Sequence, residues 1–193
     1  MLGAVILSGG ASRRMGSPKA LLSYQGRPFL EHLLDVARHP KINVRRVVLG
    51  ADADPISKEI KLSPDEIVVN DDWEKGQLSS IQAALHSLPP QTDGIVLFLI
   101  DHPLISSSLV DELIETFYTS GKSIVLPVYE GRRGHPVIFS AALYQELMSA
   151  PLETGARSVV WAHSGQVQIV QTNEEGCILN LNDPDTMQRA FGG

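Results

Sequence analysis

The chain has 193 residues, of which 43% are hydrophobic and 20% charged, and this composition is typical of one globular domain rather than of a disordered segment. A net charge of −6 gives no support to a general nucleic-acid coat, and the single cysteine, Cys177, excludes an internal disulfide and a cysteine-based zinc cluster. The chain has no apolar run of membrane-spanning length and no signal-peptide pattern, so we expect one cytoplasmic domain, residues 1–193, with no membrane or nucleic-acid partner.

The first predicted element is a buried strand at 2–7, and the loop that leaves it is the most informative segment of the chain. Residues 7–19 combine paired glycines, a serine hydroxyl and three cations. Glycines allow a backbone to bring several N–H groups close to an anion. Full positive charges around the same point come from Arg13, Arg14 and Lys19. We therefore predict a triphosphate cradle, the alternative being a flexible, solvated loop.

A polar segment at 70–80 lies in the middle of the chain. Before it, the hydrophobic pattern predicts a helix at 28–38, a strand at 47–50, a short helix near 56–60 and a strand at 66–70. The segment leads through Gly76 into a helix predicted at 78–88. Free N–H groups at a helix start, together with the hydroxyls of Ser79 and Ser80, suit recognition of a base edge or a ribose. The alternative is a plain loop before a capped helix.

The most apolar strand is predicted at 94–100, and it ends at Asp101. Mg²⁺ prefers hard oxygen ligands and needs only one or two protein carboxylates when phosphates supply the rest. A carboxylate at the end of a central strand suits that role. The alternative is that Asp101 caps the helix predicted at 106–119. With the phosphate loop present, we favour Mg²⁺ as the cofactor and Asp101 as its ligand.

A basic turn at 131–136 lies between strands predicted at 123–127 and 137–140. Its arginines, Arg132 and Arg133, either hold a second phosphate in bidentate fashion or form a solvated surface turn.

The last part of the chain is predicted to hold helices at 141–148 and 156–163, strands near 167–170 and 177–181, and a closing helix. Asn180 and Asn182 would lie on one face of the last strand, because side chains alternate along a strand. They either complete a metal or phosphate shell, or leave Asp183 to cap the closing helix.

The alternation of strands and helices predicts an α/β fold: a mainly parallel, twisted sheet with helices on both faces. Ligands in such folds bind beyond the carboxyl ends of the strands, where the strand order reverses. The phosphate loop and Asp101 both follow strands, so we expect them to meet around one metal-bound nucleotide.

These segments together resemble the molybdenum-cofactor nucleotidyltransferases, within the broader group of sugar-nucleotide-type nucleotidyltransferases. That family opens with a Leu-Ala-(Ala or Gly)-Gly-x-Ser-x-Arg-Met-Gly-x-x-Lys loop, which residues 7–19 match except that Ser8 replaces alanine. The other matches are Asn70, Trp73, Gly76, Ser79 and Ser80, then Asp101-His102-Pro103, Arg133 to Phe139, Gly155-Ala156-Arg157, and Asn180 to Pro184.

The resemblance implies a nucleotidyltransferase fold, Rossmann-like and GT-A-like, and a reaction that joins a nucleoside triphosphate to the terminal phosphate of molybdopterin with release of pyrophosphate. It implies three catalytic residues, Arg14, Lys19 and Asp101, and a metal held by Asp101 and Asn182. The implied nucleotide-binding residues are Leu7, Ser8, Gly9, Gly10, Ser12, Lys19, Asn70, Gly76, Ser79 and Ser80. The implied acceptor-binding residues are Arg132, Arg133, His135 and Arg157.

The base specificity is divided between two branches of that family. The Gly-His-Pro-Val and Gly-Ala-Arg segments resemble the cytidylyltransferase branch, whereas Gly9-Gly10 resembles the guanylyltransferase branch, and Asn180-x-Asn182 departs from the Asp-x-Asp more usual in the cytidylyl branch. We expect CTP as the donor, with GTP as the alternative. The product would be molybdopterin cytosine dinucleotide, passed on by transient contact with a molybdoenzyme or its chaperone.

Two other functions remain open. The first is nucleotidyl transfer to a sugar phosphate, a phospholactate or another small phosphate. The second is a non-catalytic nucleotide-binding subunit that delivers the cofactor, and the presence of both Lys19 and Asp101 argues against it.

Overall fold

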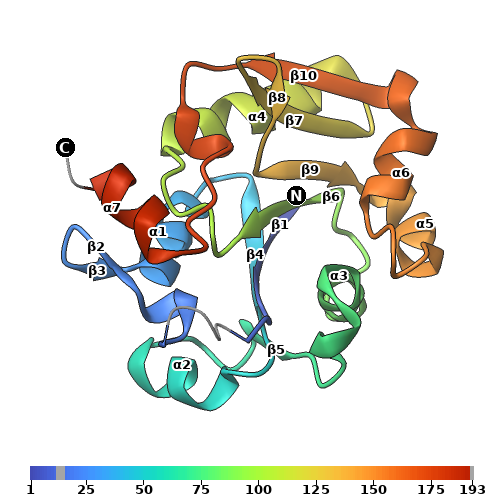
Figure 1. The fold of residues 1–193 in the computed structure, drawn as a ribbon. Coiled ribbons are helices and arrows are strands. Elements are labelled where there is room, and N and C mark those ends of the chain that lie inside the picture. The colour runs from blue at the N-terminus through green and yellow to red at the C-terminus, as the bar shows by residue number, and fades with distance from the viewer. Residues whose placement is uncertain (12–15, 192–193) are drawn as a thin grey trace.

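The computed structural model describes residues 1–11 and 16–191, and its centre is a mixed sheet in the order β10-β7-β9-β6-β1-β4-β5, with β8 paired to β7 (Figure 1). Its strands are β1 (Leu2–Ser8), β4 (Ile42–Leu49), β5 (Ile67–Val69), β6 (Gly94–Leu99), β7 (Ile124–Tyr129), β8 (Arg132–Arg133), β9 (Val137–Ser140) and β10 (Val167–Gln171). A separate small hairpin pairs β2 (Ser23–Tyr24) with β3 (Arg27–Pro28). Only β8 and β9 run antiparallel to their neighbours in the large sheet. The mainly parallel sheet confirms the predicted fold class.

Strand β1 lies inside the sheet, between β6 and β4, and both of its faces are covered. All seven of its residues are buried, as expected for a parallel strand between two layers of helices. Leu2, Ala4 and Ile6 belong to one hydrophobic cluster, and Val5 and Leu7 belong to the other. In a strand, successive side chains point to opposite faces, so one short apolar run contributes to both halves of the core.

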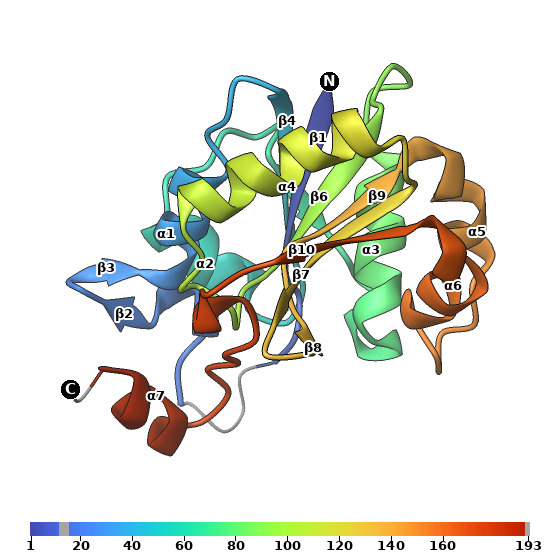
Figure 2. The ribbon, with the colours of Figure 1, turned by 90° about the horizontal axis from the view of Figure 1, so that it is seen from above.

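The helices cover both faces of the sheet (Figure 2). One face packs against α1 (Phe29–Val36), α2 (Ala53–Glu59) and α4 (Ser107–Ser120), and the other against α3 (Gln77–His86), α5 (Tyr144–Ser149) and α6 (Arg157–Ala162). The last helix, α7 (Pro184–Phe191), follows the final loop. None of the helices in the described part of the chain has the length and apolar character of a membrane span.

Helix α4 shows how local sequence sets an element's ends. The hydroxyl of Ser106 accepts a hydrogen bond from the backbone N–H of Leu109 at 3.0 Å, which is an N-cap. Gly121 ends the helix with φ of 65°, a left-handed conformation that glycine adopts without steric strain. Ser106, the first residue of the predicted helix, is therefore its N-cap.

One predicted strand boundary and one predicted strand need correction. Strand β4 begins at Ile42, five residues before the predicted strand at 47–50. The strand predicted at 177–181 is wrong: a 3₁₀ helix occupies Glu175–Cys177, and irregular chain follows it. The apolar side chains of Cys177 and Leu181 are fully buried, but they fill the core from a loop instead of joining the sheet.

Candidate active site

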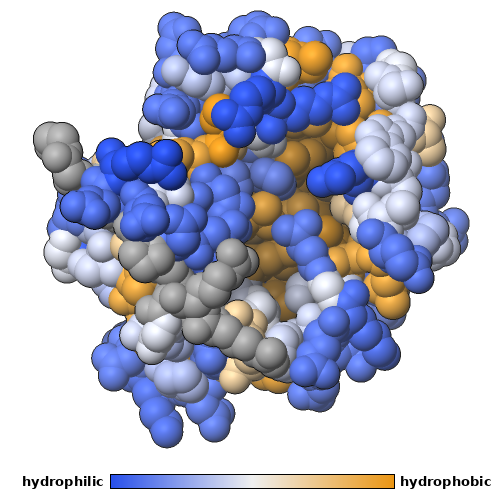
Figure 3. Space-filling view, viewed as in Figure 1, coloured by the Kyte–Doolittle hydropathy of each residue, from blue (hydrophilic) through white to orange (hydrophobic). Residues whose placement is uncertain are grey.

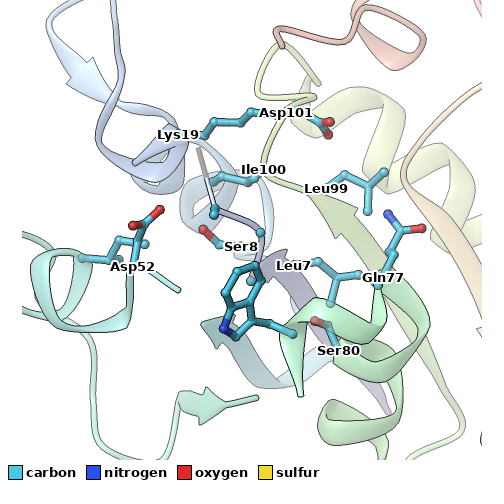
Figure 4. A pocket seen from close by; sticks show the side chains of 15 residues that line it. Leu7, Ser8, Lys19, Asp52, Gln77, Ser80, Leu99, Ile100 and Asp101 are labelled. Atoms are coloured by element: carbon cyan, nitrogen blue, oxygen red, sulfur yellow. The ribbon is translucent and has the colours of Figure 1, made fainter. Parts of the chain in front are cut away.

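A cavity of about 250 Å³ lies at the carboxyl ends of β1 and β6 (Figure 4). The chain passes from β1 to β4 on one side and returns later as β6 on the other, so this is a point where the strand order reverses. The cavity is lined by Leu7, Ser8, Gly9, Gly10, Ala11, Lys19, Asp52, Ile56, Trp73, Gly76, Gln77, Ser80, Leu99, Ile100 and Asp101. Lys19 and Asp101, predicted from separate segments, thus share one cavity.

The loop after β1 is held by close packing against the turn after β4. A Cβ atom on Gly50 would lie 2.2 Å from the carbonyl oxygen of Gly9 and 2.7 Å from the Cβ of Trp73, so only glycine fits there. The same Gly9 oxygen accepts a hydrogen bond from the N–H of Ala51 at 3.2 Å. Three segments therefore fix the start of the predicted phosphate loop. Ser12, Arg13 and Arg14 lie outside the described residues.

Two asparagines hold the two charged groups of the cavity. The amide N–H of Asn180 donates to Asp101 Oδ2 at 2.8 Å, and Lys19 Nζ donates to Asn182 Oδ1. The Asp101 side chain lines the cavity and is 19% exposed, so the hydrogen bond from Asn180 does not close it off from the cavity. Asn182 would bind a metal through its Oδ1 atom, but here this atom accepts a hydrogen bond from Lys19. The role of Asn182 as a metal ligand stays a prediction.

The segment 174–182, which we call the C-terminal strap, crosses the carboxyl end of the sheet. Its backbone makes isolated hydrogen bonds with other loops instead of a ladder. Leu181 N–H donates to the Asp101 carbonyl, and the Cys177 carbonyl accepts from His135 N–H, both at 2.8 Å. A Cβ on Gly176 would lie 2.0 Å from the Leu104 carbonyl oxygen, which shows how closely the strap packs. These isolated contacts with loops are the reason why no strand forms at 177–181.

Asn70 organises the turn that leads into α3. Its amide donates to the hydroxyls of Ser79 at 2.9 Å and Ser80 at 3.0 Å, and Ser79 donates to the Gly76 carbonyl at 2.8 Å. Asn70 and Ser79 are buried, and they do not line the cavity, whereas Gly76 and Ser80 do. The polar groups of Asn70 and Ser79 are thus engaged inside the protein, and their contact with a nucleotide remains a prediction.

A second, larger cavity of about 530 Å³ adjoins the first, and Gln77 lines both. Three of the four predicted acceptor residues line it, namely Arg133, His135 and Arg157, but Arg132 does not. In the space-filling view the hollow has an apolar floor between hydrophilic rims (Figure 3).

His135 is neutral at physiological pH. Burial, reinforced by the neighbouring His102, lowers the pKa of His135 to about 4. The two imidazole rings have their centroids 5.1 Å apart. His135 can therefore serve as a hydrogen-bonding group beside an anion, while the positive charge of this cavity comes from the arginines.

Sequence reasoning missed Asp52 and Gln77, and it quoted Trp73 without giving it a role. Asp52 follows β4 at the same sheet edge at which the glycine loop follows β1, and Gln77 is the first residue of α3. Side chains that follow neighbouring parallel strands meet at one edge, so the strand order would have identified Asp52. The strand order is not readable from one sequence.

The donor set around Asp101 fits a hard cation that is bound mainly through phosphate. Among residues 1–11 and 16–191, no group of three or more histidine, cysteine, aspartate or glutamate side chains could hold a metal ion. Two carboxylates, Asp52 and Asp101, line the cavity together with Lys19. So few protein ligands fit Mg²⁺, which keeps waters and takes phosphate oxygens. Softer metals usually need several protein ligands.

This geometry can accept a polyanion in the smaller cavity and a second anion in the larger one. The glycine loop and Lys19 line the first, and Arg133 and Arg157 line the second. Such an arrangement suits the joining of two phosphates.

Solved structures share this fold along the whole chain. The homologue of Rv0371c from Mycobacterium sp. strain JC1 is 30% identical, with a TM-score of 0.84 over 99% of this chain and 95% of that one. The manganese complex of Rv0371c from Mycobacterium tuberculosis H37Rv is 26% identical, with a TM-score of 0.76 over 100% and 98%.

Curated relatives carry two kinds of name. Nicotine blue oxidoreductase of Paenarthrobacter nicotinovorans is 30% identical over 97% of this chain and 93% of its own length. Molybdenum cofactor guanylyltransferase of Rhizobium meliloti is 32% identical over 87% and 72%. The family model described as "MobA-like NTP transferase domain" matches residues 4–167. With the fold, the paired cavities and this match in agreement, the chain belongs to the MobA-like NTP transferase family of nucleotidyltransferases.

Proposed function

We propose that this chain transfers the nucleotidyl group of CTP to the terminal phosphate of molybdopterin and releases pyrophosphate. The observation that carries the proposal is that Lys19 and Asp101 line one cavity with the glycine loop, directly beside a cavity with two arginines. The name of the R. meliloti relative, a molybdenum cofactor guanylyltransferase, supports a molybdenum-cofactor acceptor.

In this reaction an oxygen of the acceptor phosphate forms a bond to the α-phosphorus of the nucleotide while the bond to pyrophosphate breaks. The attacking phosphate is already anionic, so alignment and charge neutralisation matter more than a base. Lys19 neutralises charge on the departing pyrophosphate, with Arg14 as a predicted helper, and Arg133 and Arg157 hold the acceptor's acidic groups.

Asp101 would hold Mg²⁺, with Asn182 as the predicted second ligand, and the ion when bound neutralises the triphosphate. Asn180 orients the Asp101 carboxylate through its 2.8 Å hydrogen bond. The 19% exposure of the Asp101 side chain limits competing water.

The choice of base rests on the acceptor-side segments. The Gly-His-Pro-Val and Gly-Ala-Arg stretches favour CTP. GTP is the second candidate, because relatives at 32% and 33% identity, from R. meliloti and Flavobacterium johnsoniae, are named guanylyltransferase and probable guanylyltransferase.

The test combines thermal shift with pyrophosphate release. A ligand that binds only the native state raises stability in proportion to RT ln(1 + [L]/Kd), so the preferred nucleotide gives the largest shift with Mg²⁺. We expect CTP to exceed GTP and ATP, and pyrophosphate to appear only when molybdopterin is added. A larger shift with GTP transfers the assignment to guanylyl transfer.

Three control arms address the alternatives. Sugar phosphates and phospholactate replace molybdopterin in the first, and pyrophosphate release there would overturn the acceptor assignment. In the second, tight nucleotide binding without turnover on any acceptor would indicate a delivery subunit. In the third, the absorbance of nicotine blue is followed with the chain and a reductant; a catalysed colour change would favour the function named for the Paenarthrobacter relative.

A further inference from the structure

Trp161 exposes an unusually large apolar surface at the mouth of the larger cavity. Its side chain is 57% exposed, although it lies in α6, whose Val159 is buried in the core. Leu152, 42% exposed, lines the same cavity. Much of this indole ring is open to water and lies outside the core, and tryptophan is enriched at interfaces, where a large apolar surface meets a polar one.

Arg157 lies one helical turn before Trp161, on the same face of α6. Its guanidinium carbon is 5.9 Å from the centroid of the indole ring, within the range of a cation–π contact. Both residues line the larger cavity, and Arg133 brings a second cation. A flat aromatic wall thus lies next to two groups that bind anions.

The floor of this cavity is apolar. Buried side chains from the sheet and from α3 form it: Leu78, Leu97, Leu126, Val137 and Phe139. The hydrophobic floor between hydrophilic rims is visible in Figure 3. A sugar or a short hydroxy acid would leave its hydroxyls facing these side chains unpaired, and that is unfavourable.

We propose that Trp161 is the residue on which the heteroaromatic ring of the acceptor stacks; this rests on the proposed function. Arg133 and Arg157 bind the acidic group, while the indole and the apolar floor cover the ring. Gln77 lines both cavities, so a ring seated here has its phosphate near the nucleotide. Trp161 is a specificity-determining residue on this view.

The two tryptophans of the chain make a matched test, because Trp73 lines the smaller cavity and Trp161 the larger one. The probe is pterin-6-carboxylate, a flat ring with an acid, titrated by calorimetry and by its own fluorescence, which a stacked indole quenches. We expect Trp161→Leu to weaken binding about tenfold and to abolish the quenching. Trp161→Phe keeps a ring and most of the affinity, and Trp73→Phe changes neither.

Glycerol 3-phosphate is the non-aromatic control. It should displace the probe from the wild-type chain only weakly, and it should bind wild type and Trp161→Leu with the same affinity. Equal probe affinity and quenching in wild type and Trp161→Leu would overturn the proposal. So would a matching loss of glycerol 3-phosphate binding, because the tryptophan would then support the cavity in general. Unchanged melting temperature and Mg²⁺–nucleotide binding show that the variant is folded.

Molybdopterin turnover separates this proposal from the proposed function. Stacking of the probe on Trp161 without any pyrophosphate release would refute the function and leave the platform standing. Pyrophosphate release with the same KM for molybdopterin in wild type and Trp161→Leu would refute the platform and leave the function standing.

Discussion

Lys19 and Asp101 reach the same cavity from different parts of the chain, and an asparagine of the C-terminal strap holds each of them. Lysine and aspartate side chains have several rotamers, and a hydrogen bond to a fixed amide selects among them. Fixed charges contribute more to a transition state than mobile ones, because no reorganisation is needed when charge moves.

We predict that Lys19→Ala and Asp101→Ala keep the fold but lose turnover by about a hundredfold or more, since each removes a charged contact at the reacting phosphates. Pyrophosphate release at saturating Mg²⁺, with melting temperature alongside, measures both effects. The exposed ion pair between Lys41 and Glu115 supplies the controls Lys41→Ala and Glu115→Ala, which should keep normal rates. Near-normal product formation by either site variant would contradict the assignment.

At the scale of elements, the turn between β4 and α2 supports the glycine loop. Gly50 leaves no space for a side chain, because the Gly9 carbonyl oxygen and Trp73 pack against it. The backbone of three segments is thereby brought together at the smaller cavity.

Gly50→Ala is expected to lower stability by about 1–3 kcal/mol, because the added methyl group must push the Gly9 loop or Trp73 aside. Nucleotide affinity should fall with it, as seen by thermal denaturation and by calorimetry with Mg²⁺–CTP and Mg²⁺–GTP. Gly165→Ala is the matched control, since a Cβ there meets nothing within 4 Å and the glycine has no left-handed φ. Equal melting temperatures for the two variants would show that the packing around Gly50 is not rigid.

The hydrophobic pattern predicts a strand correctly where the apolar residues also form hydrogen bonds with neighbouring strands, as in β1 and β6. It fails for the run at 177–181, because Cys177 and Leu181 are just as apolar but are buried from a loop. Asn70 illustrates the same limit within the site. Its residue type suits a base contact, but only the structure shows its amide bonded to Ser79 and Ser80.

At the scale of the whole molecule, the two cavities are adjacent because α3 begins between them with Gln77. A single sequence gives the strands and the glycine loop, but not which strand lies beside which. The larger cavity is built from segments that are far apart in the sequence, which include Arg133, the apolar floor and Trp161. No local sequence motif therefore predicts it.

An ion pair between Arg45 and Glu66 lies near the other end of the sheet. Arg45 Nη2 lies 2.6 Å from Glu66 Oε1, and Ser63 N–H donates to Glu66 Oε2 at 2.9 Å. Burial alone would raise the pKa of Glu66, but the Ser63 hydrogen bond and the Arg45 charge outweigh it, and the pKa lies below its usual value. The folded chain therefore binds this proton more weakly than the unfolded chain.

The stabilisation from Glu66 is present above the unfolded pKa of about 4.3 and is lost as the pH falls through the lower, folded-state pKa. We expect Glu66→Gln to reduce the free energy of unfolding at pH 7, and the difference from wild type to shrink progressively as the pH drops below 4.3. Urea denaturation across this range measures it. Glu115→Gln, in an exposed pair, should show little effect at any pH. A difference for Glu66→Gln that is constant with pH would mean that the carboxylate charge is not involved.

The C-terminal strap has a consequence for biosynthesis. The ribosome makes Lys19 and Asp101 before the amides that hold them, Asn182 and Asn180. The parallel strands β1, β4, β5 and β6 are therefore complete while both charged side chains still lack these hydrogen bonds. Premature termination between β10 and Asn180 would leave the strands of the sheet in place with Lys19 and Asp101 unsupported.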